Sequence, residues 1–380
     1  MRIVDVCAFY SPSGGGVRTY VDAKLRSASR LGHEIIVLAP SDKAEVTEIA
    51  PGAVIAGIPA PTMPFDRRYR YFNDSARLHD ELDRWRPDHV ECSSPWSSAS
   101  AVARWPGSAT RALFMHSDPM AAYAYRWFGF LNPGLVDGLF SRFWDHMRFL
   151  GRSFDAVVSP SRQLAERLRQ RGLTNVATVP LGVERKFSPS RRDAELCERL
   201  LAELGLGPGA TLLLSVGRLA PEKRPDLVCR AIAEAGRSRD LGLVLVGEGP
   251  MRRKLERLAS ESARIRLLGH VSDRNEVARL MATADTLVHG CEAETFGLVV
   301  AEALACGTPV VVPDRGGAFE QLTAGDGLSY AAGDRDALTR ALLRLPPSPS
   351  RCEPGPPRLM EDHFRELFGL YGTFALAAAA

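Results

Sequence analysis

The chain has 380 residues, of which 45% are hydrophobic and 24% are charged, and its formal net charge is +3. This length suits two domains better than a single core, and so small a net charge gives no reason to expect nucleic-acid binding. No run of 18 apolar residues is present, so no bilayer-spanning segment is expected. The seven cysteines are scattered without a C-x-x-C pair, which favours reduced thiols in the cytoplasm and no metal site.

Short apolar runs alternate with amphipathic stretches along the first half of the chain. Strands are predicted over residues 3–9 and 34–38, a helix over 18–31, and further apolar runs surround residues 54, 90, 113 and 157. This alternation is typical of βαβ units in a parallel sheet that is covered on both faces.

The same rhythm restarts in the second half. Strands are predicted over residues 211–216, 242–246, 265–268, 286–289 and 309–312, and helices such as 226–235 and 251–259 separate them. The α/β pattern therefore predicts two Rossmann-like domains, residues 1–180 and 181–357, with the joint at Pro180-Leu181-Gly182. Residues 346–357 are rich in proline and are expected to form a connector. The amphipathic residues 359–376 are expected to form a helix that completes the first domain.

The most informative stretch is residues 292–312, EAETFGLVVAEALACGTPVVV. Gly297 can open a turn, and a helix is predicted over 298–306. Glu294 and Glu302 would then flank a helix N-terminus, where backbone N–H groups favour a phosphate. Carboxylates accept hydrogen bonds from sugar hydroxyls, so one glutamate could take a hexose and the other a ribose. The spacing alone also fits solvated glutamates around an ordinary strand–loop–helix unit.

The stretch resembles the E-x7-E signature of retaining glycosyltransferases of family 4, E-x-F-G-x-x-x-x-E-A-x-x-x-G-x-P-V, at every fixed position. Three further segments resemble elements of that family in the same order. They are GRLAPEK (residues 217–223), VGEGP (246–250) and PLGV (180–183). The resemblance covers residues 1–345 and is closest in the second half. It implies the GT-B fold, in which two Rossmann-like domains face each other across a central cleft and the second domain binds the nucleotide sugar.

The resemblance also implies roles for individual residues. Arg218 and Lys223 would hold the sugar donor's diphosphate, Glu302 its ribose and Glu294 its hexose. Fixed cations stabilise the charge that grows on a leaving diphosphate, and no Asp/His cluster with metal spacing is apparent, so no metal or other cofactor is expected. Without the resemblance, Arg218 and Lys223 fit ordinary surface ion pairs. The other donor-binding positions that the resemblance implies are Gly247, Gly249, Val271, Phe296, Gly297 and Leu298.

Two features of the first half match the family more loosely. Gly15 and Gly16, in the run after the first strand, resemble the family's G-G loop near the diphosphate and the acceptor, although a flexible turn would also explain them. His116 follows the apolar run 111–115 and resembles the family histidine that contacts the transferred sugar. A structural role is the alternative for His116.

Aromatic residues and arginines are mixed in residues 67–72, 123–130 and 140–149. This mixture suits an anionic membrane surface, and it also suits helices packed on a core with arginines at the rim. The segment GGVRTY (residues 15–20) is similar to sulfolipid-forming glycosyltransferases and points towards a lipid acceptor.

The resemblance therefore implies a retaining, metal-independent hexosyltransferase, in which the leaving diphosphate helps to deprotonate the acceptor. The sugar donor would be a UDP- or GDP-sugar and the acceptor a lipid or a saccharide, in the cytoplasm or at the inner face of the cell membrane. One alternative is a binding protein of the same fold without turnover. Another is a nicotinamide dehydrogenase, but the dinucleotide fingerprint is missing after the first strand.

Overall fold

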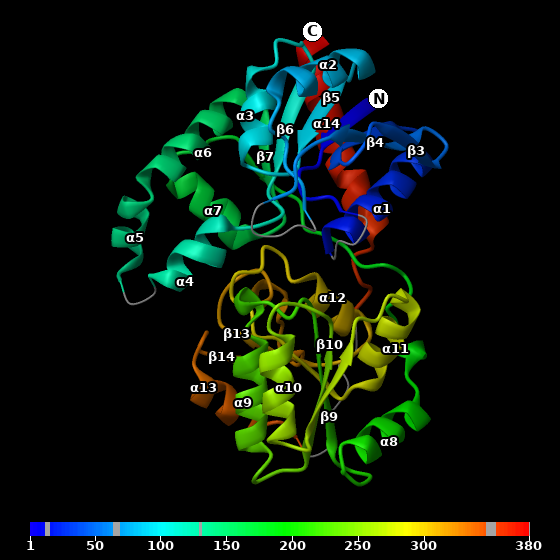
Figure 1. Cartoon of the computed structure of the whole chain (residues 1–380), viewed down its shortest axis with the longest axis vertical. Helices are drawn as coiled ribbons and strands as arrows, with labels where there is room; N and C mark the ends of the chain where they lie inside the picture. The colour runs from blue at the N-terminus through cyan, green and yellow to red at the C-terminus, as the bar shows by residue number, and fades with distance from the viewer. Residues whose placement is uncertain (12–15, 64–68, 129–130, 347–354, 380) are drawn as a thin grey trace. The chain divides into compact units, whose positions relative to one another are not determined.

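A computed structural model describes residues 1–11, 16–63, 69–128, 131–346 and 355–379. The chain divides into two compact units, which are coloured by residue number in Figure 1. Unit 1 comprises Met1–Met120, Ala124–Pro180 and Met360–Ala380, and unit 2 comprises Ala121–Tyr123 and Leu181–Leu359.

Unit 1 is built on a sheet whose strands, in the described part of the chain, follow the order β3-β4-β2-β1-β5-β6-β7-β8. The strands are β1 (Arg2–Val6), β2 (Glu34–Ser41), β3 (Glu45–Ala50), β4 (Ala53–Pro59), β5 (His89–Cys92), β6 (Thr110–Phe114), β7 (Ala156–Ser159) and β8 (Val176–Thr178). All neighbours pair in parallel except β3 and β4. The order reverses at β1, which lies between β2 and β5, and such a reversal marks the usual ligand crevice of a doubly wound sheet.

Helices cover both faces of this sheet. The helices of this part of the chain are α1 (Gly16–Arg30), α2 (Ser75–Trp85), α3 (Ser97–Arg104), α4 (Tyr125–Trp127), α5 (Pro133–Leu139), α6 (Ser141–Ser153), α7 (Arg162–Gln170) and α14 (Met360–Ala379). The π-helix η1 (Met120–Ala124) precedes α4, and its residues Ala121–Tyr123 are assigned to unit 2. Val4 and Val6 point to a core shared with α2, α3, α6 and α7. The helices α1 and α14 contact each other on the opposite face, as Figure 1 shows.

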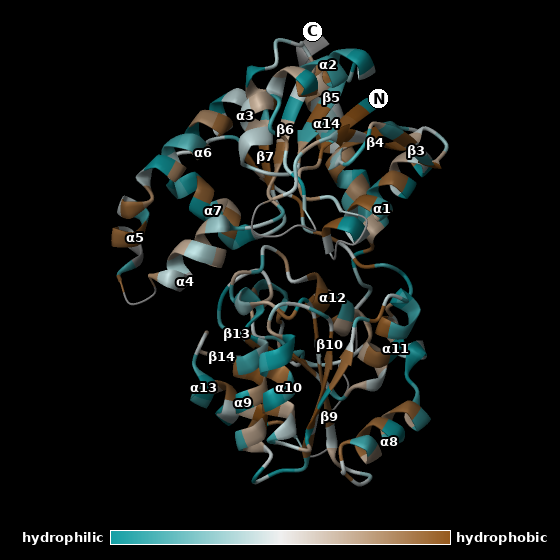
Figure 2. Ribbon diagram, in the orientation of Figure 1, coloured by the Kyte–Doolittle hydropathy of each residue, from teal (hydrophilic) through white to brown (hydrophobic). Residues whose placement is uncertain are grey.

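Unit 2 has a fully parallel sheet in the order β11-β10-β9-β12-β13-β14 among the described residues. Its strands are β9 (Thr211–Val216), β10 (Leu241–Val246), β11 (Ile265–Gly269), β12 (Thr286–Val288), β13 (Val310–Pro313) and β14 (Gly327–Tyr330). Leu212 and Leu214 of β9 enter one apolar cluster and Leu213 enters another. A strand whose odd and even residues are both apolar needs helices on both faces of the sheet. Figure 2 shows the hydrophobic colour on the strands of this sheet.

The helices of unit 2 provide those two covers. They are α8 (Ala194–Glu203), α9 (Pro225–Ala235), α10 (Arg252–Ser260), α11 (Arg274–Thr283), α12 (Leu298–Ala305) and α13 (Arg335–Leu343), with the 3-10 turns η2 (Pro189–Arg191), η3 (Pro221–Lys223) and η4 (Phe319–Gln321). α8, α11 and α12 pack on the face that includes Leu212, and α9 and α13 pack on the face that includes Leu213. The predicted α/β class with two Rossmann-like domains is confirmed.

The structure corrects several predicted boundaries. β1 ends at Val6 and not at residue 9, and β3 is an exposed antiparallel edge strand that was not predicted. α14 continues beyond residue 376 through alanines, the residues with the highest helix propensity. Residues 347–354 of the predicted connector lie outside the described residues. Over the residues described, no helix combines the length and the apolar character that crossing a membrane requires.

Candidate functional site

The loops after β9 and β12 meet at the point where the strand order of unit 2 reverses. β9 lies between β10 and β12 in the sheet, and loops at the carboxyl ends of such strands form the ligand crevice of α/β sheets. The loop after β9 carries Arg218 and Lys223, and the loop after β12 carries Glu294. The fold thus brings together two segments that lie about seventy residues apart in the sequence.

Lys223 and Glu294 form a direct ion pair in this crevice. Lys223 Nζ lies 2.5 Å from Glu294 Oε1, and both side chains are largely buried. Burial alone would raise the pKa of Glu294, but Lys223 and then His289 hold it well below its usual range. Burial likewise opposes the charge of Lys223, yet Glu294 raises the pKa of this lysine. The pair therefore presents a fixed carboxylate and a fixed ammonium side by side at neutral pH.

A second ion pair, which the sequence did not indicate, holds the two loops together. Arg224 donates from Nε to Glu292 Oε2 at 2.8 Å and from Nη2 to Glu292 Oε1. Arg224 has a φ of 47°, in the left-handed region, which costs a non-glycine residue about 1–2 kcal/mol. A Cβ at Gly290 would lie 2.8 Å from Lys223 O, so the loop backbones are in close contact. Arg224 and Glu292 are therefore positioned to fix the places of Lys223 and Glu294.

The N-terminus of α12 opens beside this pair. Gly297 is its N-cap with a φ of 79°, and no side chain of the described residues caps the helix. A Cβ at Gly297 would lie 2.9 Å from Ala318 Cα, so packing as well as φ requires glycine there. Gln321 Nε2 donates to the carbonyls of Phe296 and Gly297 and holds this turn. Val300 N–H and Ala301 N–H donate to the carbonyl of Gly297, so Leu298 and Val299 supply the N–H groups that can bind an anion at this end of the helix.

Glu302 lies inside α12 and contacts a different partner. Arg274 Nη2 donates to Glu302 Oε1, and Arg274 Nε donates to Glu184 Oε1 at 3.1 Å. Burial, which Arg274 offsets only in part, raises the pKa of Glu302 to about 7. The guanidinium also lies 4.7 Å from the ring centre of Phe187. Glu294 and Glu302 are thus in unlike environments. Arg274 could not be predicted as the partner of Glu302, because the contact spans 28 residues.

The remaining predicted positions of unit 2 lie on neighbouring loops. A Cβ at Gly247 would lie 1.9 Å from Gly217 O, and one at Gly249 would lie 2.4 Å from Leu219 O. Both glycines therefore have a packing reason that needs no ligand, and their contact with a nucleotide stays a prediction. Arg218 is exposed and pairs with Glu222 at 2.5 Å, not with Glu294. Val271 is partly buried against the apolar cluster of α8, α11 and α12.

In unit 1, His116 follows β6 and lies against two aromatic rings. Its ring centre is 4.7 Å from that of Tyr20 and 4.6 Å from that of Phe114. Burial lowers the pKa of His116 to about 4, so the imidazole is neutral at pH 7. Gly16 is the first residue of α1, with open space around a Cβ, so packing does not demand glycine there. Gly15 lies outside the described residues.

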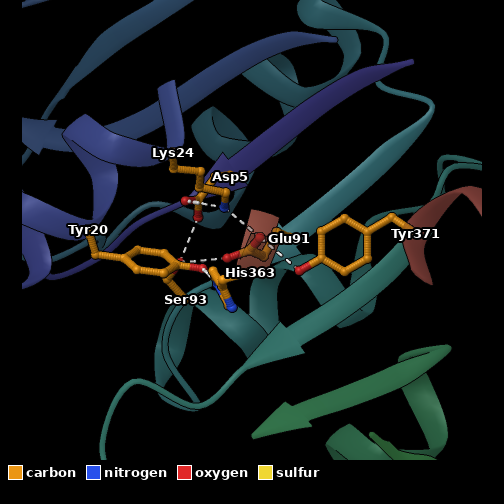
Figure 3. Close-up of polar contacts among 7 residues, drawn as sticks. All are labelled: Asp5, Tyr20, Lys24, Glu91, Ser93, His363 and Tyr371. Carbon is orange, nitrogen blue, oxygen red and sulfur yellow. Dashed lines mark hydrogen bonds and ion pairs between the residues drawn. The ribbon is translucent and has the colours of Figure 1, made fainter. Parts of the chain in front are cut away.

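A buried charge cluster lies in the core of unit 1, and Figure 3 shows its polar contacts. Lys24 Nζ lies 2.9 Å from Asp5 Oδ2 and 2.5 Å from Glu91 Oε2, and all three side chains are fully buried. Ser93 donates to Asp5, and Tyr371 donates to Glu91 Oε2 at 2.8 Å. α14 also brings His363, whose ring nitrogens lie 3.0 Å from Tyr20 Oη and 2.8 Å from Pro180 O. The last helix is therefore part of this polar core, and Tyr20 connects it to His116.

The aromatic and basic segment of unit 1 has two kinds of side chain. Trp144 is buried and donates to Asp137 at 3.0 Å, as the core interpretation predicted. Trp127, Leu135 and Leu139 are instead 62%, 63% and 65% exposed. Two arginines of the predicted basic segment, Arg67 and Arg68, lie outside the described residues, as do residues 129–130.

Comparison with known proteins identifies the family. Residues 198–353 match the family described as Glycosyl transferases group 1, and residues 14–187 match Glycosyltransferase Family 4. A GDP-mannose-dependent alpha-(1-6)-phosphatidylinositol dimannoside mannosyltransferase of Mycobacterium tuberculosis is 34% identical over 357 residues, which cover 92% of this chain and 89% of that protein. The chain belongs to glycosyltransferase family 4.

Two further comparisons agree with this assignment. A GDP-mannose-dependent alpha-mannosyltransferase of Mycobacterium tuberculosis is 30% identical over 332 residues, which cover 85% of this chain and 82% of that protein. The sucrose-phosphate synthase of Thermosynechococcus elongatus matches in structure with a TM-score of 0.71 at 19% identity, over 100% of this chain and 98% of that chain. This family 4 glycosyltransferase has the predicted GT-B fold and transfers a glycosyl group from a nucleotide sugar.

Proposed function

We propose that this glycosyltransferase moves a mannosyl residue from GDP-mannose to a hydroxyl of a phosphatidylinositol-type glycolipid, with retention of the anomeric configuration. The observation that carries the proposal is the Lys223–Glu294 pair beside the uncapped start of α12. It occurs in a chain that is 34% identical, over 92% of its length, to a GDP-mannose-dependent mannosyltransferase. The geometry offers cations and N–H groups for a diphosphate and a charged carboxylate for a hexose.

Each charged group has one role in this mechanism. Arg218, Lys223 and the N–H groups of α12 hold the diphosphate, so Lys223 exchanges part of its contact with Glu294 for a phosphate oxygen. Glu294 then accepts hydrogen bonds from hexose hydroxyls, and Glu302 accepts them from the ribose. Loss of one such contact in the transition state costs about 2.7–4 kcal/mol. No metal is required, because the cations already offset the charge of the leaving diphosphate.

The acceptor side of the proposal uses His116 and the leaving group. His116, neutral at pH 7, contacts the transferred mannosyl group through a ring nitrogen. No side chain is assigned as a covalent nucleophile. The leaving diphosphate takes the proton of the acceptor hydroxyl as the new bond forms on the same face, so the α configuration of the donor is kept. Release of the mannose from the product by an α-mannosidase tests retention, and resistance to that enzyme would refute it.

The exposed apolar side chains of unit 1 suit a lipid surface. Trp127, Leu135 and Leu139 lie within thirteen residues and are all more than half exposed, and Arg142 is exposed at the start of α6. Aromatic and aliphatic side chains enter the boundary of a bilayer while arginine pairs with anionic headgroups. We infer that this surface docks on an anionic membrane, where a glycolipid acceptor is available.

A panel of sugar nucleotides tests the donor. Thermal unfolding is measured with GDP-mannose, GDP, UDP-glucose and UDP, because a ligand that binds the folded state stabilises it by mass action. The expected result is a shift with GDP-mannose and GDP and none with the uridine compounds. Transfer of labelled mannose to a phosphatidylinositol mannoside is measured in parallel. Selective stabilisation by a UDP-sugar would refute the assigned donor, and binding without transfer over an acceptor panel would favour a binding protein.

Membrane docking is tested with vesicles. Wild-type protein and the variants Trp127→Ala and Leu135→Ser are sedimented with vesicles that contain phosphatidylinositol, and with neutral phosphatidylcholine vesicles as the control. Binding to the anionic vesicles, weakened in both variants, is the expected result. Equal sedimentation of all three proteins, or none of the wild type, would contradict the assigned surface.

A further inference from the structure

The loop after β12 brings an imidazole, a thiol and a carboxylate together. They belong to His289, Cys291 and Glu294, and one ligand atom of each lies within 4.8 Å of the other two. His289 Nε2 is 3.5 Å from Glu294 Oε1. This combination of nitrogen, sulfur and oxygen ligands is typical of zinc sites and unsuited to magnesium.

The imidazole of His289 is available to a ligand. The residue is only 6% exposed, and Nε2 makes no well-aligned hydrogen bond within the described residues, although Glu294 Oε1 lies 3.5 Å away. A buried polar atom without a partner is uncommon and costs about 1–3 kcal/mol. Tyr330 Oη donates to the backbone carbonyl of His289 at 3.0 Å and so holds the residue in place. Because Nε2 is 3.5 Å from Glu294 Oε1, this nitrogen faces Glu294.

The thiol of Cys291 is the second unused group. It is buried and forms no disulfide. Coordination to a divalent ion would replace the thiol proton, with one S–metal bond formed and one proton released to solvent. Ligand atoms around a tetrahedral zinc ion lie about 3.5 Å apart, given bonds of about 2.0–2.3 Å. Ligand atoms that now lie within 4.8 Å of one another would therefore have to come about 1 Å closer together to bind such an ion.

We propose that His289, Cys291 and Glu294 form an inhibitory site for a thiophilic divalent cation, with Zn²⁺ as the type ion. At present Lys223 supplies the positive charge beside Glu294, so the metal ion and the lysine compete for one carboxylate. A bound ion withdraws Glu294 from the hexose and displaces Lys223 from its place. Binding depends on the three ligands alone, whereas inhibition rests on the proposed roles of Lys223 and Glu294.

Cobalt binding tests the site without any turnover. Co²⁺ is titrated into the full-length wild-type protein and into His289→Asn, Cys291→Ser and, as a matched control, Cys197→Ser. Thiolate-to-cobalt charge-transfer absorption that disappears in Cys291→Ser and persists in Cys197→Ser is expected. Zn²⁺ should displace the cobalt. Absence of thiolate bands in the wild type, or their persistence in Cys291→Ser, would overturn the proposal.

Inhibition is tested by the mannosyl-transfer assay under reducing conditions. Zn²⁺ should inhibit the wild type reversibly, with recovery on chelation and no effect of Mg²⁺. Cys291→Ser should stay active and need at least about tenfold more Zn²⁺ for half-inhibition, because loss of a metal-site group weakens binding by that factor or more. The activity that His289→Asn retains should show the same loss of zinc sensitivity. Unchanged zinc sensitivity in both variants would overturn the inhibitory role. If the chain shows no mannosyl transfer, the cobalt titration still decides the site.

Discussion

Two substitutions of Arg224 should separate two contributions to the free energy of unfolding, the backbone strain at this residue and the stabilisation by its ion pair with Glu292. Arg224→Ala leaves the largely buried carboxylate of Glu292 without its two hydrogen bonds, at a cost of about 1.5–3 kcal/mol. Arg224→Gly loses the same ion pair, but it also removes the backbone strain of a φ of 47°, a change that stabilises the folded state by about 1–2 kcal/mol. The greater chain entropy of glycine in the unfolded state offsets about 0.5–1 kcal/mol of that gain. For a domain of this size one kcal/mol corresponds to about 2–4 °C.

Arg224→Ala should therefore lower the Tm of unit 2 by roughly 3–12 °C, and Arg224→Gly should melt a few degrees higher than Arg224→Ala. Differential scanning calorimetry measures both, with Arg237→Ala as a control, since Arg237 is 75% exposed in a surface pair with Glu234. Both Arg224 variants should also lose kcat/KM for the sugar donor, because the loops that carry Lys223 and Glu294 are no longer held together. Equal Tm values for the two variants, or unchanged kcat/KM, would refute this reasoning.

Two further predictions concern other buried groups. Tyr371→Phe removes the hydroxyl that donates a hydrogen bond to Glu91 and should lower the free energy of unfolding of unit 1 by about 1–3 kcal/mol. An unchanged calorimetric Tm would count against that contact. The pKa of Glu302 is raised in the folded state to about 7, so its contribution to stability is full below pH 4.5 and is lost as pH rises through 7. Glu302→Gln should flatten the decline of Tm between pH 5 and 8, and parallel curves for the two proteins would contradict the shift.

The regular parts of the fold were predictable from local pattern. β9 was predicted at its observed bounds because Thr211–Val216 is apolar at both parities and is followed by glycine. α12 was predicted within one residue because Gly297 and Gly307, both with positive φ, bracket an apolar helix. β3 was missed because an exposed edge strand carries polar residues and lacks a buried run.

The contacts that complete the site could not be predicted in the same way. Arg274 reaches Glu302 across 28 residues, and Tyr371 reaches Glu91 across 280. Each of these residues, taken alone, looks like an ordinary position on a helix or a strand. The sheet order decides which residues meet, and a single sequence carries no direct record of that order. The motif residues Lys223 and Glu294 were found by resemblance, whereas Arg224 and Glu292, which hold their loops together, were not.

The most direct test of the proposed function is the rate of mannosyl transfer in Lys223→Ala. kcat/KM for GDP-mannose is measured with a phosphatidylinositol mannoside acceptor, with the wild type and Arg237→Ala as references. Loss of a fixed cation that stabilises the leaving diphosphate should lower kcat/KM by about 10²–10³-fold, while Arg237→Ala should retain the wild-type rate. A Lys223→Ala enzyme that transfers mannose at close to the wild-type kcat/KM would contradict the proposed role of the pair with Glu294.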